Sequence, residues 1–279
     1  MAAAEATGRR AEDGSPYPDR KQPSFQRDIQ QMFTHIAEGY DGFDHIASVG
    51  NDFVWRPRAL WDLDRFRAPG PVRRVLDLGC GTGDLAVLVA RHFPQSAVVG
   101  LDFTRAMLKK ATVRHGAARE LPRVAFGQGT GLQLPFADAA FDLVTNAFVM
   151  RNFADLELAL REARRVLRPG GVFLTLEITE PTSPTFRRIF HAYFDRFVPW
   201  LGAAVGSAGP YRYLPESLRS LPSRPQLVEA MHRAGFFRIE THPQSLGIVT
   251  TFLAEAGPSN GAGSCGVRLF FPVLERGGL

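Results

Sequence analysis

The sequence RVLDLGCGTGD, residues 74–84, is a short apolar run that stops at three alternating glycines. Such a run predicts a buried strand that ends in a tight turn. Because Gly79, Gly81 and Gly83 have no Cβ, the backbone of the turn can adopt positive φ and approach a ligand closely before a helix begins. The spacing is G-x-G-x-G, and Asp84 stands where a dinucleotide fingerprint has its last glycine. The turn therefore predicts a nucleotide-like ligand and disfavours NAD.

Strand and helix patterns alternate downstream of this turn. Each element is marked by the helical spacing of apolar residues or by a short apolar run bounded by turn residues. Five alternations of this kind predict an α/β fold, with a parallel sheet, right-handed crossovers and helices on both faces. Two further strands are expected to close the sheet as a hairpin. The expected strands are 97–101, 124–127, 141–147, 172–178, 237–242 and 248–255, and the expected helices are 85–92, 104–115, 156–167 and 226–234.

The composition divides the chain around this sheet. Residues 1–23 are small, charged and proline-containing, so we expect a disordered leader. Residues 24–70 begin with an amphipathic helix and continue with an aromatic and polar segment, which together predict an N-terminal helical lid on the main domain at 71–255. An aromatic-rich insertion at 181–222 fits either a cap over an apolar substrate or a helix packed on the core. Residues 256–279 do not follow the repeat and form an atypical C-terminal tail.

Bulk composition limits the class of protein. The 279 residues can bury one large core, and the two cysteines, Cys80 and Cys265, give no disulfide framework and fit a reducing compartment. The net charge of +5 fits a solvated basic surface or an anionic partner. No apolar run reaches the ~18 residues of a membrane-spanning helix, so we expect a cytoplasmic protein. The seven histidines show no paired ligand spacing, so no metal site is predicted.

An acid and two loops are expected beside the glycine turn. Asp102 follows Gly83 by nineteen positions and ends the second strand, where such an acid can bind both hydroxyls of a ribose. The alternative is that Asp102 only caps the next helix. The loop at 129–131 and the stretch at 147–150 follow the third and fourth strands and supply walls for an adenine and a sulfur-bearing chain. All of these lie at the carboxyl ends of parallel strands, where open α/β sheets bind ligands.

The motifs VLDLGCGTGD, GLDFTRAML, LPFADAAFDLV and RVLRPGG resemble the successive motifs of class I S-adenosylmethionine-dependent methyltransferases. More narrowly, YDGFDHIASVGNDFVW, AFVMRNFADLELAL, RVLRPGGVFLTLEIT and YRYLPESLRSLPS are similar to the ubiquinone/menaquinone biosynthesis C-methyltransferase family, over about residues 25–255. The resemblance implies a Rossmann-like class I methyltransferase fold, with a mostly parallel seven-stranded sheet and a helical lid and insertion. It also implies S-adenosyl-L-methionine as methyl donor and C-methylation of a demethylated, prenylated quinol in ubiquinone/menaquinone biosynthesis.

Carried over position by position, the resemblance implies cofactor contacts at Gly79, Gly81, Thr82, Asp102, Thr130, Gly131 and Ala147. Some residues depart from the family pattern. Thr130 stands where an Asp or Asn normally meets the adenine, although its hydroxyl can still accept a hydrogen bond. Phe43 and Asp44 change the lid, and Val149 with Met150 replaces a Gly-Leu pair beside the methyl-transfer site. We expect cofactor binding to survive these changes.

Carbon methylation of a quinol requires that the phenolic proton leaves and that the ring carbon faces the sulfonium methyl in line. Arg151, at the end of the fourth strand, is the candidate to stabilise the phenolate or to hold a water that takes the proton. Its alternative role is a structural ion pair with Asp155. Asn152 is expected to orient the ring and Tyr40 to close over the cofactor.

Proteins with other functions would bind S-adenosylmethionine through the same part of the domain. An O- or N-methyltransferase of a small aromatic metabolite and a non-catalytic S-adenosylmethionine-binding scaffold in a biosynthetic complex both stay open. A nucleic-acid methyltransferase is disfavoured, because an Asp/Asn-Pro-Pro-aromatic motif and a Pro-Cys context are absent. If the substrate carries a polyprenyl tail, the insertion and its arginines predict peripheral attachment to the inner membrane without spanning it. A homodimer is a further open alternative.

Overall fold

The computed structural model describes residues 24–36, 52–116, 123–197 and 215–258, together with Pro18, Arg20 and Gln22. Several predictions from the sequence lie outside these residues. They are Tyr40 and the lid positions around it, nearly all of the leader 1–23, the middle of the insertion 181–222, and the tail from residue 259 onward.

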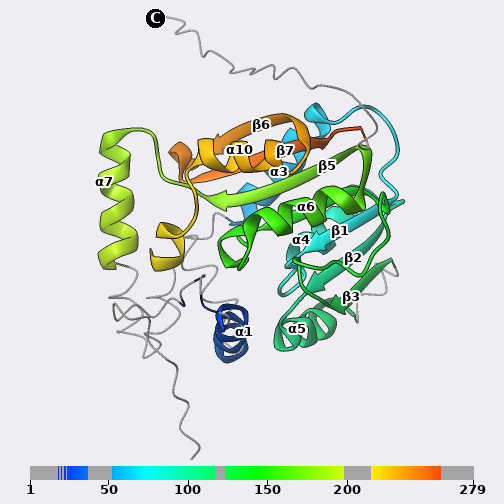
Figure 1. The fold of residues 1–279 in the computed structure, drawn as a ribbon, viewed down its shortest axis with the longest axis horizontal. Coiled ribbons are helices and arrows are strands. Elements are labelled where there is room, and N and C mark those ends of the chain that lie inside the picture. The colour runs from blue at the N-terminus through cyan, green and yellow to red at the C-terminus, as the bar shows by residue number, and fades with distance from the viewer. Residues whose placement is uncertain are drawn as a thin grey trace, which may run out of the picture.

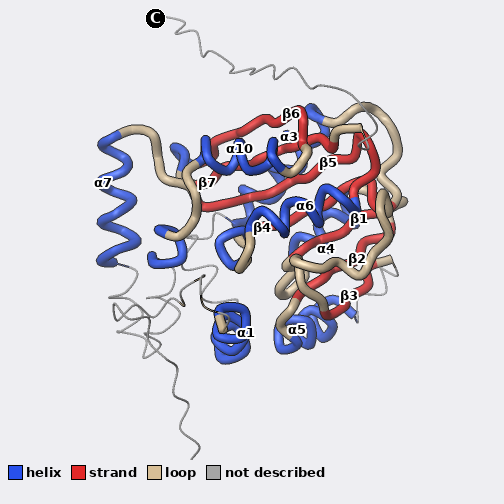
Figure 2. Tube along the Cα trace, in the orientation of Figure 1, coloured by secondary structure: helices blue, strands red, loops and turns tan. Residues whose placement is uncertain are grey.

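The core of the structure is one seven-stranded sheet in the order β3-β2-β1-β4-β5-β7-β6 (Figures 1 and 2). The five strands from β3 to β5 are parallel, whereas β7 pairs antiparallel with both β5 and β6. The predicted α/β fold and its terminal hairpin are therefore confirmed. The strands are β1 (Arg74–Leu78), β2 (Ala97–Asp102), β3 (Val124–Gln128), β4 (Phe141–Ala147), β5 (Leu167–Ile178), β6 (Phe236–Gln244) and β7 (Val249–Ala256).

The strand β5 begins earlier than its sequence suggests. Phe141 pairs with Leu167 and Leu143 pairs with Val172, so the intervening residues of β5 bulge out of the ladder. Gly170 within this bulge has φ of 73°, a conformation that glycine adopts without strain. The expected turn at 169–171 is thus a bulge inside the strand rather than a break before it.

Helices cover both faces of the sheet, as the alternation predicts. The helices α3 (Asp52–Phe66) and α4 (Asp84–His92) bury their apolar residues in one cluster on one face. The helices α6 (Leu156–Val166) and α10 (Arg224–Arg233) contribute to the cluster on the opposite face. The helix α5 (Arg105–Gly116) packs against β2 and β3 at the edge. Burial on both faces explains why the central strands read as continuous apolar runs.

The helix α3 belongs to this core. Trp55, Leu60, Leu63 and Phe66 are buried among residues of α4 and the sheet, and the Trp55 indole Nε1 donates a hydrogen bond to Ser245 Oγ at 2.8 Å. The sequence assigns this stretch to a lid at 24–70. Since α3 is packed into the domain, a lid is restricted to residues that precede it.

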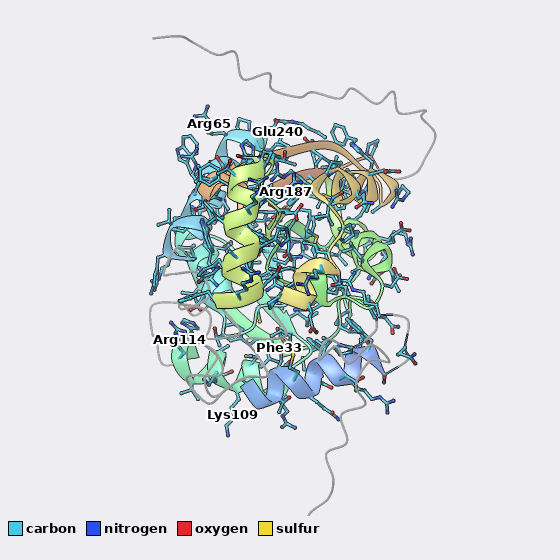
Figure 3. The ribbon with its side chains drawn as sticks, turned by 90° about the vertical axis from the view of Figure 1, so that its left-hand side faces the viewer. Phe33, Arg65, Lys109, Arg114, Arg187 and Glu240 are labelled. Atoms are coloured by element: carbon cyan, nitrogen blue, oxygen red, sulfur yellow. The ribbon has the colours of Figure 1, made fainter. Side chains whose placement is uncertain are left out.

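Three elements lie at the edge where the parallel strands end. These are α1 (Phe25–Ile36), α7 (Pro184–Ala192) and the π-helical turn η3 (Tyr193–Phe197). Figure 1 shows the arrowhead of β5 directed toward α7, with α1 below, and Figure 3 shows both helices from that side. The predicted amphipathic helix is thus found as α1. Its buried face, with Phe25 and Ile29, packs on Phe103 and Ala154.

Candidate active site

The glycine turn between β1 and α4 is tied to the neighbouring strand β2. The backbone amides of Gly79 and Cys80 both donate to the carbonyl oxygen of Leu101, at 2.7 and 3.1 Å. Gly79, Gly81 and Gly83 have φ of 70°, 54° and 86°. A Cβ on Gly79 would lie only 2.6 Å from a Val149 methyl, whereas one on Gly81 would meet nothing within 4 Å. The turn therefore has open space at Gly81, where a ligand can approach its backbone.

The Asp102 carboxylate, only 7% exposed at the end of β2, joins this turn to α5. Its Oδ2 accepts the Gly81 amide at 2.9 Å and its Oδ1 accepts the Thr104 amide at 2.7 Å. Burial raises the pKa of this carboxyl. Each oxygen can still accept a further hydrogen bond. Asp102 thus fixes the residue just before α5 and does not cap the first turn of the helix, and the same carboxylate remains able to bind a ribose.

One small pocket lies between the Asp102 side of the turn and the loop after β3. Thr130 and Gly131 line it, as the sequence predicts, and so do Asn152 and Gln26. The Thr130 hydroxyl accepts hydrogen bonds from Gln26 Nε2 at 3.2 Å and from the Leu132 amide at 3.3 Å. Gln26 comes from α1, far away in the sequence, and no motif marks it. The position of this pocket, beside Asp102 and the loop after β3, is suited to an adenine.

A second pocket lies on the other side of the glycine turn. Its lining includes one carboxylate and one guanidinium, which are complementary to the ammonium and the carboxylate of an amino acid. Thr82, Ala147 and Phe148 line it together with Asp77 and Arg56. The buried Asp77 accepts the Thr145 hydroxyl through Oδ1 at 2.8 Å, while its Oδ2 has no hydrogen-bond partner among the described residues. Burial raises the pKa of Asp77 to about 7.

This second pocket fits the amino acid end of S-adenosylmethionine. An orphaned buried carboxylate oxygen requires a donor, and the ammonium of the cofactor would be such a donor for Asp77. The guanidinium of Arg56 is suited to the cofactor carboxylate. Neither residue received a role from the sequence. Asp77 lies in the strand that precedes the glycines, and Arg56 lies in a helix whose place in the fold is not evident from the sequence.

The predicted catalytic residue Arg151 lies in the short helix η2 (Met150–Asn152) directly after β4. Arg151 is 8% exposed, and its Nη1 lies 3.2 Å from Oε2 of Glu177, which is fully buried in β5. The other Glu177 oxygen accepts the Met150 amide at 2.7 Å. Burial raises the pKa of Glu177, and the Arg151 charge opposes this shift. Asp155, the alternative ion-pair partner, instead caps α6 by accepting the Leu158 amide at 2.8 Å.

Phe148 connects the second pocket with Arg151. It has φ of 62°, an unusual conformation for a residue with a side chain, and such strain costs on the order of 1–3 kcal/mol. Its amide donates to Leu176 at 2.8 Å, and its ring packs edge-on against Trp55 at 6.1 Å. The Arg151 guanidinium lies 6.0 Å from the ring centroid. The backbone here is thus held so that one aromatic ring both lines the pocket at the glycine turn and lies near Arg151.

Comparison with known proteins agrees with this arrangement. Residues 21–255 match the model of the ubiE/COQ5 methyltransferase family. The chain belongs to this family. It is 42% identical over 225 residues to a demethylmenaquinone methyltransferase of Thermus thermophilus, which covers 80% of this chain and 99% of that protein. It is 34% identical over 228 residues to a ubiquinone/menaquinone biosynthesis C-methyltransferase UbiE of Geotalea daltonii, covering 81% of this chain and 95% of that protein.

Solved structures share the fold at low sequence identity. A SAM-dependent methyltransferase of Thermotoga maritima superposes with a TM-score of 0.55 at 17% identity, over 82% of this chain and 99% of that one. The phosphoethanolamine N-methyltransferase 2 of Haemonchus contortus, in complex with S-adenosyl-L-methionine, gives a TM-score of 0.52 at 18% identity, over 73% of this chain and 53% of that one.

The predicted family, enzyme class and cofactor are confirmed. The ubiE/COQ5 family member described here is an S-adenosylmethionine-dependent methyltransferase. None of the helices in the described ranges is long and apolar enough to cross a membrane.

Proposed function

We propose that this enzyme methylates a ring carbon of a demethylated quinol that carries an isoprenoid tail. The names of the relatives, demethylmenaquinone methyltransferase and C-methyltransferase, support this substrate and this product. The observation that carries the proposal is the position of Arg151. Its guanidinium is held by a buried carboxylate next to the ring of Phe148, which itself lines the pocket at the glycine turn.

We assign the cofactor to the two pockets on either side of the glycine turn. Asp102 would bind the ribose and Asp77 with Arg56 the amino acid end, as their positions in the pockets support. The predicted contacts Gly79, Gly81, Thr82, Thr130, Gly131 and Ala147 all line one of these pockets. When bound, S-adenosylmethionine supplies an electrophilic methyl group.

Gln26 completes the adenine site in our proposal. Its Nε2 is used by the Thr130 hydroxyl, which leaves its carbonyl oxygen as an acceptor. The exocyclic amine of adenine is a donor that requires such an acceptor. We therefore assign to Gln26 the role that an Asp or Asn at position 130 has elsewhere in the family.

Arg151 and its neighbouring side chains each have one role in the proposed reaction. The phenolic oxygen of the quinol loses its proton to a water, and the Arg151 guanidinium stabilises the resulting phenolate. Asp77 and Arg56 would hold the donor so that its electrophilic methyl group can be transferred to the electron-rich ring carbon, which would then lose its hydrogen as a proton to water. Glu177 keeps the guanidinium in place. Asn152 lines the pocket that we assign to adenine. Its proposed contact with the quinol ring therefore requires the ring to reach the wall of that pocket.

Two further parts of the proposal concern the surroundings of the site. Tyr40 would close over the cofactor.

We also propose that the carboxyl edge of the sheet rests on the surface of the inner membrane. Phe186 and Ile189 of α7 support this attachment, since these apolar residues are 38% and 58% exposed. Retention on anionic lipid vesicles at low salt, lost when Ile189 is replaced by Glu, tests this attachment. A homodimer stays a prediction.

Product analysis tests the proposed reaction. The enzyme is incubated with S-adenosylmethionine and a panel of demethylated quinols and simple phenols, and the products are resolved by mass spectrometry. We expect methylation of the quinols on carbon. Methyl transfer to oxygen or nitrogen of a simple phenol or amine would support the alternative enzyme, and cofactor binding without any turnover would support a scaffold.

A further inference from the structure

A separate cavity of about 690 Å³ lies beside the carboxyl end of β5, between α7 and the start of α10. This volume is within the range of small-molecule sites, about 300–1,000 Å³. Its lining residues are all different from those of the two pockets at the glycine turn. Figure 1 shows α7 standing apart from the sheet at this edge, and Figure 3 shows α7 from the front, with Arg187 labelled. The cavity is therefore separate from the two pockets that we assign to the cofactor.

Apolar groups make up most of the exposed surface inside the cavity, although charged and hydroxyl side chains also line it. Phe190 and Phe194 are buried on the α7 side, with ring centroids 4.6 Å apart, and Ile178 ends β5 below them. Leu218 also lines the cavity and packs against the same apolar cluster as Phe190 and Phe194. The same apolar cluster packs against Phe148, which lines the cofactor pocket. Ile178 also directly follows Glu177, the residue that pairs with Arg151, so the cavity begins one residue beyond the proposed methyl-transfer site.

The charged residues around the cavity are mostly paired with one another. Arg187 Nε lies 3.5 Å from Glu180 Oε2, and His191 Nε2 lies 2.7 Å from Glu180 Oε1. The other nitrogen of His191 lies 3.3 Å from Asp195, whose second oxygen lies 2.9 Å from Arg219 Nη2. Two carboxylates thus balance two guanidinium groups. The chain of ion pairs also joins α7 to the segment after β5 and to the segment before α10, which fixes α7 over the cavity.

One cation among the lining residues is not part of these ion pairs. Arg224 has no carboxylate within ion-pair distance in the described part of the chain, and its Nη2 donates to the Thr179 hydroxyl at 3.4 Å. Burial lowers the pKa of this side chain. Arg224 would suit the head group of an anionic amphiphile, whereas the remaining walls suit an uncharged chain. The predominance of apolar walls and the pairing of the other charges favour the uncharged chain.

We propose that this cavity binds the isoprenoid tail of the quinol substrate. The proposal rests on the proposed function, because a tail must be attached to the ring that is methylated. The ring would lie at Arg151 and Phe148, and the tail would pass Ile178 into the cavity lined by Phe194 and Leu218. Binding of the tail would give the enzyme a preference for tailed substrates over the same ring without a tail.

The test fills the cavity without changing the methyl-transfer site. Leu218→Trp adds an indole to the cavity wall, and Val113→Trp adds the same group to a 73% exposed position on α5 as a matched control. Leu218→Phe is a smaller second variant in case the tryptophan impairs folding, which thermal unfolding reports. Two readouts are compared. One is displacement of the neutral dye N-phenyl-1-naphthylamine by farnesol, and the other is the ratio of kcat/KM between a tailed and an untailed demethylated quinol.

We expect farnesol to displace the dye from the wild type and from V113W but much more weakly from L218W. The tailed-to-untailed ratio of kcat/KM should fall by about tenfold in L218W, the effect of losing burial of about two methylene groups, and by less in L218F. Unchanged displacement and an unchanged ratio in well-folded L218W would overturn the proposal. Displacement by palmitate and not by farnesol, abolished in R224Q, would identify an anionic amphiphile site and also overturn it. A third outcome separates the two proposals. If farnesol displaces the dye from the wild type but not from L218W, and no quinol is methylated, the tail-binding cavity is supported and the proposed function is contradicted.

Discussion

The guanidinium of Arg151 lies 3.2 Å from the carboxylate of Glu177, and both groups are almost completely removed from solvent at the ends of β4 and β5. A buried pair of this kind seldom adds net stability compared with apolar residues, and its common benefit is that it fixes a position. Because Glu177 also accepts the Met150 amide at 2.7 Å, it holds both the side chain and the backbone of η2. We therefore interpret Glu177 as the residue that positions Arg151.

Replacement of Arg151 tests its role in charge stabilisation. Arg151→Lys keeps a cation in contact with Glu177 but loses the planar guanidinium. We expect kcat to fall by about 100-fold, the usual effect of removing one oxyanion donor, with the KM for S-adenosylmethionine within a factor of two of the wild type. Steady-state kinetics with each substrate varied in turn gives both constants.

Arg151→Ala should also lower turnover, yet it leaves Glu177 as a buried charge without its guanidinium, which costs about 3–5 kcal/mol of stability. Glu177→Gln is the comparison variant, since it removes the charge but keeps one acceptor oxygen, which can serve the Met150 amide or the Arg151 guanidinium but not both. We expect E177Q to lower kcat less than R151K does. Retained activity in R151K, or an equal loss of turnover and cofactor affinity, would count against the assigned role.

The raised pKa of Asp77 predicts how stability depends on pH. The carboxyl has a pKa of about 7 in the fold, whereas an unfolded aspartate titrates at about 3.9. Between these values the folded chain binds a proton that the unfolded chain has lost, so the free energy of unfolding falls as pH rises from about 4 to 7. The total loss is on the order of 4 kcal/mol. Urea unfolding across this window should show a flatter pH dependence in Asp77→Asn, and identical slopes in the two proteins would contradict the assignment.

The same carboxyl should make cofactor binding dependent on pH. Ionised Asp77 attracts the cofactor ammonium, whereas protonated Asp77 does not, so the affinity for S-adenosylhomocysteine should rise between pH 6 and pH 8. Isothermal titration calorimetry measures this trend. In D77N the rise should be absent, because no carboxylate forms at that position. A rise of the same size in D77N would assign the titration to another group.

Gln26 should contribute to recognition of the adenine. Loss of one hydrogen bond in a pocket costs about 0.5–1.5 kcal/mol, so Gln26→Ala should weaken S-adenosylhomocysteine binding by about 2- to 13-fold. Gln30→Ala is the control on the same helix, since Gln30 binds the Phe103 carbonyl and does not line the pocket. An equal loss in the two variants would show that α1 acts only as a cover.

The parallel sheet and the cofactor loop could be predicted from the sequence because their signals are local. The run at 74–84 contains both the strand and the glycines, and Asp102 follows at a spacing set by one strand–helix–strand unit. The sequence assigns α3 to a lid and not to the core because Pro57 lies inside it and its apolar residues alternate with arginines and aspartates. The bulge at the start of β5 was missed because Pro-Gly-Gly is also typical of a turn.

The parts of the site that could not be predicted depend on contacts between distant segments. Glu177 meets Arg151 only because β4 and β5 are neighbours in register, 26 residues apart in sequence. Gln26 meets Thr130 across 104 residues. Arg56 reaches the glycine turn only once α3 is packed on α4. None of these pairs has a spacing that a single sequence reveals.

The most direct test of the central claim is to locate the transferred methyl group. The enzyme is given S-adenosylmethionine with a carbon-13-labelled methyl group and a demethylated quinol, and the product is examined by NMR. The proposal requires a labelled methyl bonded to a ring carbon in the wild type, and the same product at a much lower rate in R151K. A labelled methyl on oxygen, or no labelled product from protein that binds S-adenosylhomocysteine, would contradict it.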